Sequence, residues 1–367
     1  MKVVLGSVLK PVNDSRVYKK IGKSLAKLAS SEILIVGTDI KDATPEEGNI
    51  KFYPIFKEKK KVVHRLVANN HFFRFLKKHQ PGIIIIHTIE LIPSIILFKY
   101  LHPEVKIIYD ILENYPLNFT EQRYHKKYLS PILSFAAQRI ENLCFKYVDH
   151  LFVAEKTYFE EKKLPINKAT ILENKYGGEI ELRSFQPGKI HFLMCGSITK
   201  IFGAHHFLDF IDAVNKLKIE KYSFSIIGKA YEKDIIERIR IAELKYQNVS
   251  AIGIEEFVSH DLIIEKMLEA NFVCLPYPYN KSTKGCIPTK MYECLALKIP
   301  MIINPNPLWE NITNPQNAAL YHDFTSDKVT DLLKKLDSYV GYKNSPDQID
   351  PLWKSEEEKL LKVIQTL

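Results

Sequence analysis

The feature that most constrains this chain is a repeated alternation of short apolar runs with amphipathic stretches. Apolar runs of four to eight residues bounded by turn residues are typical of buried strands. Amphipathic stretches between such runs are typical of the helices that connect parallel strands. The pattern therefore predicts an α/β fold built from parallel βα units.

The alternation occurs as two successive series. The first predicts strands at residues 3–6, 32–37, 82–87, 106–110, 150–153 and 170–172, with helices at 15–29, 65–78, 91–101 and 131–147. The second predicts strands at 191–196, 223–228, 249–253, 272–276 and 300–304, with helices at 204–216, 234–245, 261–269 and 288–297. Between them, Lys175-Tyr176-Gly177-Gly178 breaks the rhythm and predicts a hinge.

Two Rossmann-like doubly wound domains follow from this division, because 367 residues exceed what one hydrophobic core usually serves. We expect one domain at residues 1–174 with 350–367, and the other at 175–349. Ligands of such sheets bind at the carboxyl ends of the strands, here in a cleft between facing domains. The amphipathic helix after Pro351 is either a terminal cap or an element that crosses back to the first domain.

Several classes of protein are disfavoured by the sequence. No run of eighteen uninterrupted apolar residues is present, and the first residues lack the pattern of a cleavable signal. The five cysteines are odd in number and contain no CxxC pair, which argues against a zinc site or a disulfide framework. A reducing cytoplasm is the compartment that fits this cysteine usage.

Positive charge is concentrated in the first half of the chain. Residues 1–175 contain 29 Lys and Arg against 18 Asp and Glu, whereas the rest contains 23 against 25. Stretches such as 57–61 and 77–79 are either solvated helix faces or a surface attracted to anionic phospholipids or nucleic acid. No nucleic-acid-binding motif accompanies the charge. As an anionic partner, a membrane surface is therefore favoured over nucleic acid, with the protein peripheral on the inner face of the membrane.

The most specific local feature is the segment 285–293, which reads Gly-Cys-Ile-Pro-Thr-Lys-Met-Tyr-Glu. Pro288 suits the first turn of a helix, and the backbone N–H groups of Thr289 and Lys290 would then face a diphosphate. Lys290 and Glu293 are three residues apart and share one helical face. They are either a surface ion pair or a cation for phosphate and a carboxylate for ribose hydroxyls.

Small and polar residues follow other predicted strands. In the second series Gly196 and Ser197 end one strand and Gly228 ends the next, while Lys200 is either a solvated loop lysine or a phosphate contact. In the first series the strand-end candidates for acceptor contact or proton transfer are Asp14, Arg16, His87, Asp110 and Glu113. Asp14 is alternatively a helix N-cap, and His87 a core histidine.

These segments together resemble the GT4-type group of GT-B glycosyltransferases over nearly the whole chain. The resemblance is carried by residues 13–17, 106–116, 147–155, 171–174 and 194–198, most specifically by 288–296, and by the tail 353–361. It implies transfer of a sugar from a nucleotide diphosphate donor, UDP being the favoured nucleotide, to a hydroxyl of a lipid-linked or polysaccharide acceptor. It also implies retention of configuration, no cofactor and no bound metal, and a final helix packed on the N-terminal domain.

Carried over by position, the resemblance assigns a donor site. Glu293 would hold the ribose, Thr289 and Lys290 with Gly196 and Ser197 the diphosphate, and the segment from Ile254 to Phe257 the base. Gly285, Cys286 and Ile287 would approach the donor sugar. Stabilisation of the departing diphosphate would then be electrostatic.

Three positions depart from the pattern of that group. Gly285 stands where many members carry a second glutamate, Phe202 replaces a basic residue before Gly203, and Leu112 replaces a histidine. Lys290 or Lys200 could replace the missing cation. The departures keep two alternatives open: a catalytically silent binding or scaffold protein of the same fold, and a nucleotide-sugar epimerase or hydrolase.

Overall fold

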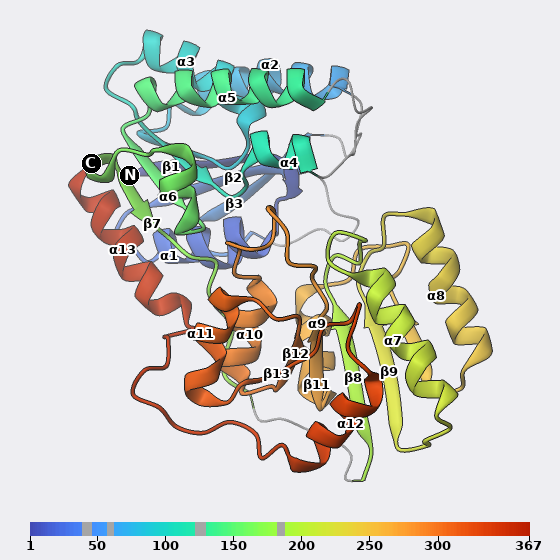
Figure 1. Ribbon diagram of the computed structural model, residues 1–367. Coiled ribbons are helices and arrows are strands. Elements are labelled where there is room, and N and C mark those ends of the chain that lie inside the picture. Colours follow the sequence, from blue (N-terminus) through green and yellow to red (C-terminus); the bar gives the residue numbers. More distant parts are fainter. Residues whose placement is uncertain (39–45, 57–61, 122–129, 182–187) are drawn as a thin grey trace. The chain divides into compact units, whose positions relative to one another are not determined.

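The computed structural model describes residues 1–38, 46–56, 62–121, 130–181 and 188–367 (Figure 1). The chain divides into two compact units. Unit 1 comprises Met1–Gly177 and Trp353–Leu367, and unit 2 comprises Gly178–Leu352. The sequence-based boundaries fell three residues before each of these divisions. The basic stretch 57–61, expected to contribute to an anionic-surface contact, lies outside the described residues.

Unit 1 contains a seven-stranded parallel sheet in the order β3-β2-β1-β4-β5-β6-β7. The strands are β1 (Lys2–Pro11), β2 (Glu32–Thr38), β3 (Ile50–Phe56), β4 (Ile83–Ile86), β5 (Lys106–Ile111), β6 (His150–Val153) and β7 (Ala169–Ile171). The helices are η1 (Ser15–Gly22), α1 (Lys23–Ala26), α2 (Val62–His79), η2 (Ile89–Leu91), α3 (Ile92–Leu101), α4 (Tyr115–Glu121), α5 (Ser130–Tyr147), α6 (Thr157–Lys162), η3 (Ile166–Lys168) and α13 (Trp353–Thr366).

Helices cover both faces of this sheet because alternate residues of its strands are apolar on both sides. Val4, Leu34 and Ile84 pack with α2, α3 and α5 on one face (Figure 1). Their neighbours Val3 and Ile83 pack with η1, α1 and α13 on the other face. Continuous apolar runs such as 83–86 therefore fill two cores at once.

Unit 2 contains a six-stranded parallel sheet in the order β10-β9-β8-β11-β12-β13. Its strands are β8 (Ile190–Cys195), β9 (Tyr222–Ile227), β10 (Val249–Ile252), β11 (Phe272–Leu275), β12 (Met301–Ile303) and β13 (Ala319–Tyr321). Its helices are α7 (Ala204–Lys216), α8 (Lys233–Lys245), α9 (His260–Glu269), α10 (Thr289–Leu297), α11 (Pro307–Thr313), η4 (Asn314–Gln316) and α12 (Val329–Ser338). An aromatic-rich core joins α7, α8 and α12 to one face of the sheet.

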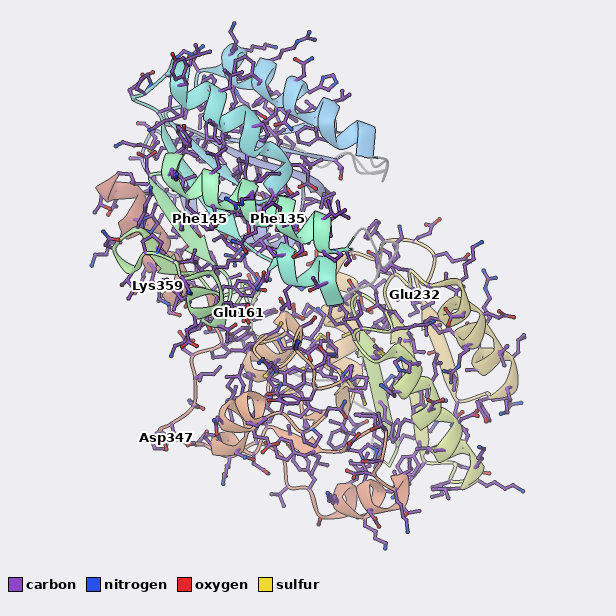
Figure 2. All side chains as sticks on the ribbon, turned by 45° about the horizontal axis from the view of Figure 1, so that its top comes forward. Phe135, Phe145, Glu161, Glu232, Asp347 and Lys359 are labelled. Atoms are coloured by element: carbon purple, nitrogen blue, oxygen red, sulfur yellow. The ribbon has the colours of Figure 1, made fainter. Side chains whose placement is uncertain are left out.

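The final helix α13 belongs to unit 1, which confirms that the C-terminal helix crosses back to the N-terminal domain. The Trp353 indole is buried there and donates a hydrogen bond of 2.9 Å to Ser24 Oγ. Glu356 is also buried, 2.9 Å from Lys175 Nζ and 2.7 Å from Nζ of Lys359, which is labelled in Figure 2. Packing and ion pairs thus fix α13 to unit 1.

Several elements of the structure were not predicted from the sequence. Strand β3 was not predicted because it is an edge strand containing Pro54 and Lys51 between its apolar residues. The short elements α4, α6, α11, α12 and β13 were also not predicted. Helix α10 begins at Thr289 with Pro288 as its N-cap, one residue later than predicted.

Candidate functional site

The loops that follow β8, β9, β10 and β11, together with the first turns of α10, carry the predicted donor-site residues of unit 2. β8 lies between β9 and β11, so the chain leaves β8 in one direction and returns on its other side. Such a switch point is where open parallel sheets bind ligands, at the carboxyl ends of the strands. The residues concerned are Gly196, Ser197, Lys200, Gly228, Ile254, Phe257, Gly285, Cys286, Ile287, Thr289, Lys290 and Glu293.

Two glycines bring the backbones of β8 and β9 together at this edge. Gly196 and Gly228 adopt φ angles of +105° and +127°, in a region that other residues rarely occupy. A Cβ atom at Gly228 would lie 1.9 Å from the carbonyl oxygen of Gly196. Glycine is therefore required at position 228 by both the backbone angle and the close approach of the two loops.

The next element of the site is the N-terminal turn of α10. Every residue of this helix from Lys290 to Leu297 is buried, so its position relative to the sheet is fixed by packing. The N-terminal end of a helix carries a partial positive charge and backbone N–H groups that favour anions. The side chains of Lys290 and Glu293 project from this first turn.

The buried carboxylate of Glu293 is held by two side chains, Lys290, which is also buried, and His260, which is half-buried. One of its carboxylate oxygens, Oε1, lies 2.8 Å from Nε2 of His260, and Lys290 Nζ donates to the other, Oε2. His260 is the first residue of α9, which is capped by the Ser259 side chain. Helices α9 and α10, which flank strand β11 in the chain, thus each contribute a contact to this carboxylate.

The electrostatic consequence is a carboxylate that stays ionised. Burial alone would raise the pKa of Glu293, but the Lys290 cation and the His260 hydrogen bond outweigh burial and lower this pKa to about 2. Burial alone would likewise lower the pKa of Lys290, yet attraction to Glu293 raises it above its usual value. Both side chains therefore carry charge at neutral pH.

Lys290 also contacts the end of strand β8. A Cβ atom at Gly196 would lie 3.4 Å from Lys290 Cε, so the lysine chain runs along the glycine backbone. The structure therefore brings Gly196, Lys290 and Glu293 together, although they are separated by nearly a hundred residues in the chain.

The loop between β11 and α10 is held by its own hydrogen bonds. The backbone N–H of Cys286 donates to the Thr283 carbonyl at 3.2 Å, and the Cys286 carbonyl accepts from Trp309 Nε1 at 2.7 Å. Trp309 is buried under the loop. Gly285, Cys286 and Ile287 are all half-buried at this point.

An aromatic pair occupies the position where the resemblance leads one to expect a cation. Phe202 stacks on Tyr277, with ring centroids 4.8 Å apart and an interplanar angle of 26°. Tyr277 in turn makes an edge contact with Trp309. The departure at Phe202 is thus part of a packed aromatic cluster, and Lys290 lies on a different element.

The remaining predicted donor residues lie at the more exposed end of the same loops. Lys200 is exposed with its Nζ 2.5 Å from Asp234 Oδ2, and Ser197 is exposed in a bend. Ile254 packs against the unit 2 core. Phe257 is exposed and lies under Lys229, whose Nζ is 3.9 Å from the ring centroid.

In unit 1 the strand-end residues form a second buried cluster. Arg16 donates to both oxygens of Asp110, from Nε at 2.8 Å and Nη2 at 2.7 Å, and to the Leu172 carbonyl. His87 Nδ1 lies 2.9 Å from Asp110 Oδ2. All three residues of this cluster are buried, so the sequence-predicted Arg16, His87 and Asp110 meet at the carboxyl ends of β1, β4 and β5.

Asp110 is a weak base in this environment. Burial would raise its pKa, but the charge of the Arg16 guanidinium and the hydrogen bonds with Arg16 and His87 hold this pKa well below the usual range. Arg16 Nη1 and His87 Nε2 are buried and make no hydrogen bond to any described residue. The geometry thus favours a positioning role for Asp110, which holds Arg16 and His87, over a role in direct proton transfer.

The other two unit 1 candidates are placed differently. Asp14 is the N-cap of the π-helix η1 and accepts from the backbone N–H groups of Arg16 and Val17 at 2.9 and 3.1 Å. Glu113 lies exposed in the bend after β5, outside the buried cluster. Among the described residues, no three His, Cys, Asp or Glu side chains are grouped so as to hold a metal ion.

Two residues of the unit 2 site were not predicted from the sequence. His260 contacts Glu293, but no sequence motif surrounds His260. Lys229 lies over the Phe257 ring, and its only sequence signal is that it follows Gly228 at the end of β9. The serine cap before α9 is the single sequence signal that places His260 at a helix start.

Sequence comparison identifies no relatives: no protein-family model matches the chain, and no curated protein sequence matches it. Comparison of the fold with solved structures does find likenesses. Sucrose-phosphate synthase of Thermosynechococcus elongatus superimposes with a TM-score of 0.69 at 12% identity, covering 98% of this chain and 94% of that one.

Two further structures extend this result. The catalytic domain of starch synthase IV from Arabidopsis thaliana, bound to ADP and acarbose, has a TM-score of 0.67 at 10% identity, covering 100% of this chain and 98% of that one. HepE of Anabaena in complex with UDP has a TM-score of 0.63 at 10% identity, with 100% of both chains covered. The chain therefore has the GT-B fold of these glycosyltransferase structures.

Proposed function

We propose that this protein is a glycosyltransferase that moves a hexose-type sugar from a nucleotide diphosphate donor, UDP-linked in the first instance, to a hydroxyl of a lipid-linked or polysaccharide acceptor. The observation that carries the proposal is the buried Lys290–Glu293 pair at the start of α10, beside Gly196, with His260 of α9 on the second carboxylate oxygen. The fold supports the class of reaction, because solved structures with the same fold contain UDP or ADP.

In this proposal each part of the unit 2 site has one task. Glu293 accepts hydrogen bonds from the ribose hydroxyls, and its pKa of about 2 keeps it in the accepting form. The first turn of α10 and the Lys290 cation stabilise the diphosphate. The loop at Gly196 and Ser197 approaches the phosphates through its backbone, Gly285, Cys286 and Ile287 face the donor sugar, and Ile254 and Phe257 face the base. Lys200 and Gly228 complete the diphosphate side.

The reaction breaks the bond between the sugar C1 atom and the β-phosphate oxygen, which keeps the electron pair. The acceptor oxygen forms the new bond to C1, and its proton passes to the departing diphosphate. Groups that stabilise the negative charge on the leaving diphosphate lower the barrier, because that charge grows in the transition state. Retention of configuration and independence of metal ions are proposed from the resemblance of the sequence.

On the acceptor side we assign the unit 1 cluster. Arg16 Nη1 and His87 Nε2 are the polar atoms proposed to meet the acceptor, with Asp110 holding both side chains and Asp14 capping the helix that carries Arg16. Glu113 is the exposed carboxylate of this region and is proposed to contact an acceptor hydroxyl.

A nucleotide titration tests the donor site. Calorimetry with UDP, GDP and ADP is compared between wild type, Glu293→Gln and the control Glu141→Gln. Glu141 is also a fully buried carboxylate, 2.6 Å from Lys162 Nζ, but it lies in unit 1. We expect one nucleotide to bind and Glu293→Gln alone to weaken it at least tenfold, about 1.4 kcal/mol. Equal binding by all three proteins would refute the assignment.

A second candidate, a catalytically silent binding protein, is favoured by the aromatic stack at Phe202 and by Gly285 in place of a carboxylate. Assay of nucleotide-sugar consumption separates the possibilities. Acceptor-dependent release of the nucleotide supports transfer, and consumption without any acceptor indicates an epimerase or hydrolase. Nucleotide binding without turnover over a broad acceptor and sugar screen supports the silent protein.

A further inference from the structure

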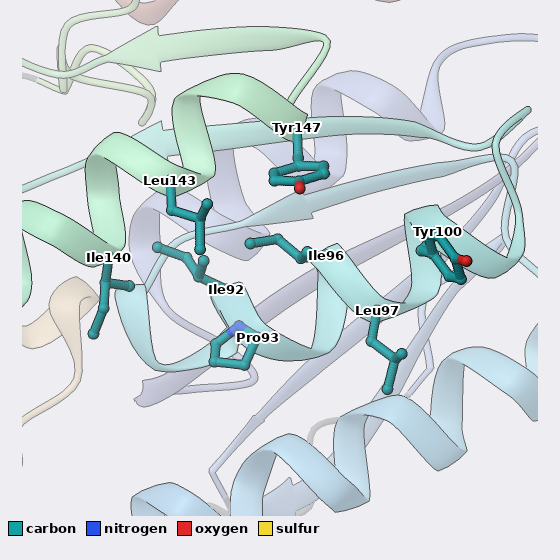
Figure 3. Close-up of a pocket in the computed structure, with 8 residues that line it drawn as sticks. All are labelled: Ile92, Pro93, Ile96, Leu97, Tyr100, Ile140, Leu143 and Tyr147. Carbon is teal, nitrogen blue, oxygen red and sulfur yellow. The ribbon is translucent and has the colours of Figure 1, made fainter.

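The layer formed by helices α2, α3 and α5 of unit 1 exposes several large apolar side chains. Helices α3 and α5 enclose a groove of about 360 Å³ whose lining is almost entirely apolar (Figure 3). Leu97 and Tyr100 of α3 are 49% and 79% exposed, and Leu143 of α5 is 46% exposed. Phe135, labelled in Figure 2, extends this surface along α5 and is 62% exposed. Contiguous apolar surface of this kind marks an interaction site.

The charges on the same three helices have one sign. Their sequences contain a single acidic residue, Glu141, which is buried and paired with Lys162. Among the side chains that the structure describes on these helices, the exposed charged ones are Arg74, Lys77 and Lys78 on α2 and Arg139 and Lys146 on α5. Arg139 lies 4.9 Å from the centroid of the Phe135 ring, so a cation and an exposed aromatic ring share one place on the surface.

We propose that this helix layer docks on an anionic phospholipid membrane, with the α3/α5 groove and its flanking apolar side chains inserted among the lipid headgroups. Surface helices that bind membranes combine Lys and Arg with exposed large apolar side chains in this way. Tyr100 and Tyr147, which both line the groove, have an apolar ring and a polar hydroxyl suited to the headgroup region. The basic residues supply attraction to anionic lipids.

This occupant is favoured over a second copy of the chain by charge. A symmetric dimer through this layer would place the same patch against itself and bring like charges together. A membrane contact is also consistent with the absence of any described helix long and apolar enough to cross a bilayer, since the proposed helices lie on the surface.

Vesicle sedimentation of the full chain tests the proposal. Vesicles of phosphatidylcholine with about one third phosphatidylglycerol are compared with pure phosphatidylcholine at low and high salt, because screening weakens exposed charges. We expect binding to the anionic vesicles, at least tenfold weaker for Leu97→Ser/Leu143→Ser and for Arg74→Gln/Lys77→Gln/Lys78→Gln. The matched control is Leu244→Ser, an 89% exposed leucine of unit 2, which should bind as wild type.

Absence of binding to anionic vesicles, or equal binding by both sets of variants and wild type, would overturn the proposal. Sedimentation velocity without lipid tests the other occupant: a wild-type dimer that Leu97→Ser/Leu143→Ser dissociates, with no vesicle binding, assigns the layer to a second copy. Melting temperatures of all variants establish that they are folded. Vesicle binding is measured without nucleotide, so its result is independent of the proposed donor site.

Discussion

Nε2 of His260 lies 2.8 Å from Oε1 of Glu293, and the two residues come from different helices of unit 2. Lys290 donates to the other oxygen, so each carboxylate oxygen has one partner and keeps a further lone pair. A ribose hydroxyl can donate to a remaining lone pair or replace one of these contacts. Of the two, the His260 contact is the more readily exchanged, since its ring is 27% exposed while the Lys290 chain is buried.

The coupling between these residues is measurable by a double-mutant cycle. His260→Ala and Glu293→Gln should each lower the free energy of unfolding, and the double variant should lose less than their sum. A hydrogen bond to a charged group contributes about 1.5–3 kcal/mol, so we expect a coupling of that order. Urea unfolding provides the four values. Strictly additive losses would show that the His260 contact contributes no stability.

Stability in acid should report the low pKa of Glu293. Its folded pKa of about 2 lies below the usual 4.5, so its contribution to stability is present above pH 4.5 and is lost as pH falls toward 2. By linkage this contribution is on the order of 3 kcal/mol. We expect Glu293→Gln to be less stable at pH 6 and to lose less stability between pH 5 and pH 2.5. Parallel pH profiles for the two proteins would contradict the assigned pKa.

Removal of the Asp110 carboxylate should expose the dependence of Arg16 on it. Asp110→Asn leaves a buried guanidinium without its counter-charge, and loss of one partner of a buried pair costs about 3–5 kcal/mol. Arg16→Met combined with Asp110→Asn should recover part of that loss, because no unpaired charge remains. Denaturant unfolding of the single and double variants gives the comparison. A double variant less stable than Asp110→Asn would argue against a simple ion pair.

Position 228 should tolerate no side chain. Gly228→Ala combines an unfavourable φ angle with a Cβ atom 1.9 Å from the Gly196 oxygen, so we expect a loss of more than about 3 kcal/mol. Gly341→Ala is the control, because Gly341 has φ +81° but open space around it. Its cost should be about 1–2 kcal/mol, that of the backbone angle alone. Equal melting temperatures for the two variants would remove the steric argument.

The junction of α13 with unit 1 should depend on Trp353. Trp353→Ala removes a buried ring and the hydrogen bond to Ser24, a change that typically costs about 3–5 kcal/mol. We expect faster amide hydrogen exchange along α13 and in η1, which it contacts, and no change in α7 or α8. Glu358→Ala, an exposed position on the same helix, serves as the control. Exchange that increases equally in both units would contradict a local effect.

Most of the regular structure was predictable because the pattern that specifies it is local. The strand β6 and the helix α7 were predicted to the residue, and the other predicted strands to within one residue at each end, except that β1 extends five residues beyond its predicted end. Where local preference is weak the prediction failed: β3 is stabilised by pairing with β2 in spite of its proline, and β13 by pairing with β12. Such strands are defined by their neighbours in the sheet.

The candidate site divides in the same way. The spacing of Lys290 and Glu293 placed both on one face of a helix, and the glycines at 196 and 228 followed from strand ends. The sequence carried no information on which side chains meet across the sheet. The pairing of Arg16 with Asp110 spans 94 positions and that of His260 with Glu293 spans 33, and neither pairing has a local signature.

The sequence by itself determined the order of most strands and helices along the chain, their division into two series, and the start of a helix near Pro288. These features depend on hydrophobic periodicity, capping and glycine preference, which act over a few residues. Tertiary structure alone decided which charges are buried together, that Phe202 stacks on Tyr277, and that the uncompensated cations of α2 and α5 share one layer with exposed apolar side chains. The physical reason is that desolvation and ion pairing depend on which side chains are close in space. Residues distant in the sequence come close only when the strands and helices pack together.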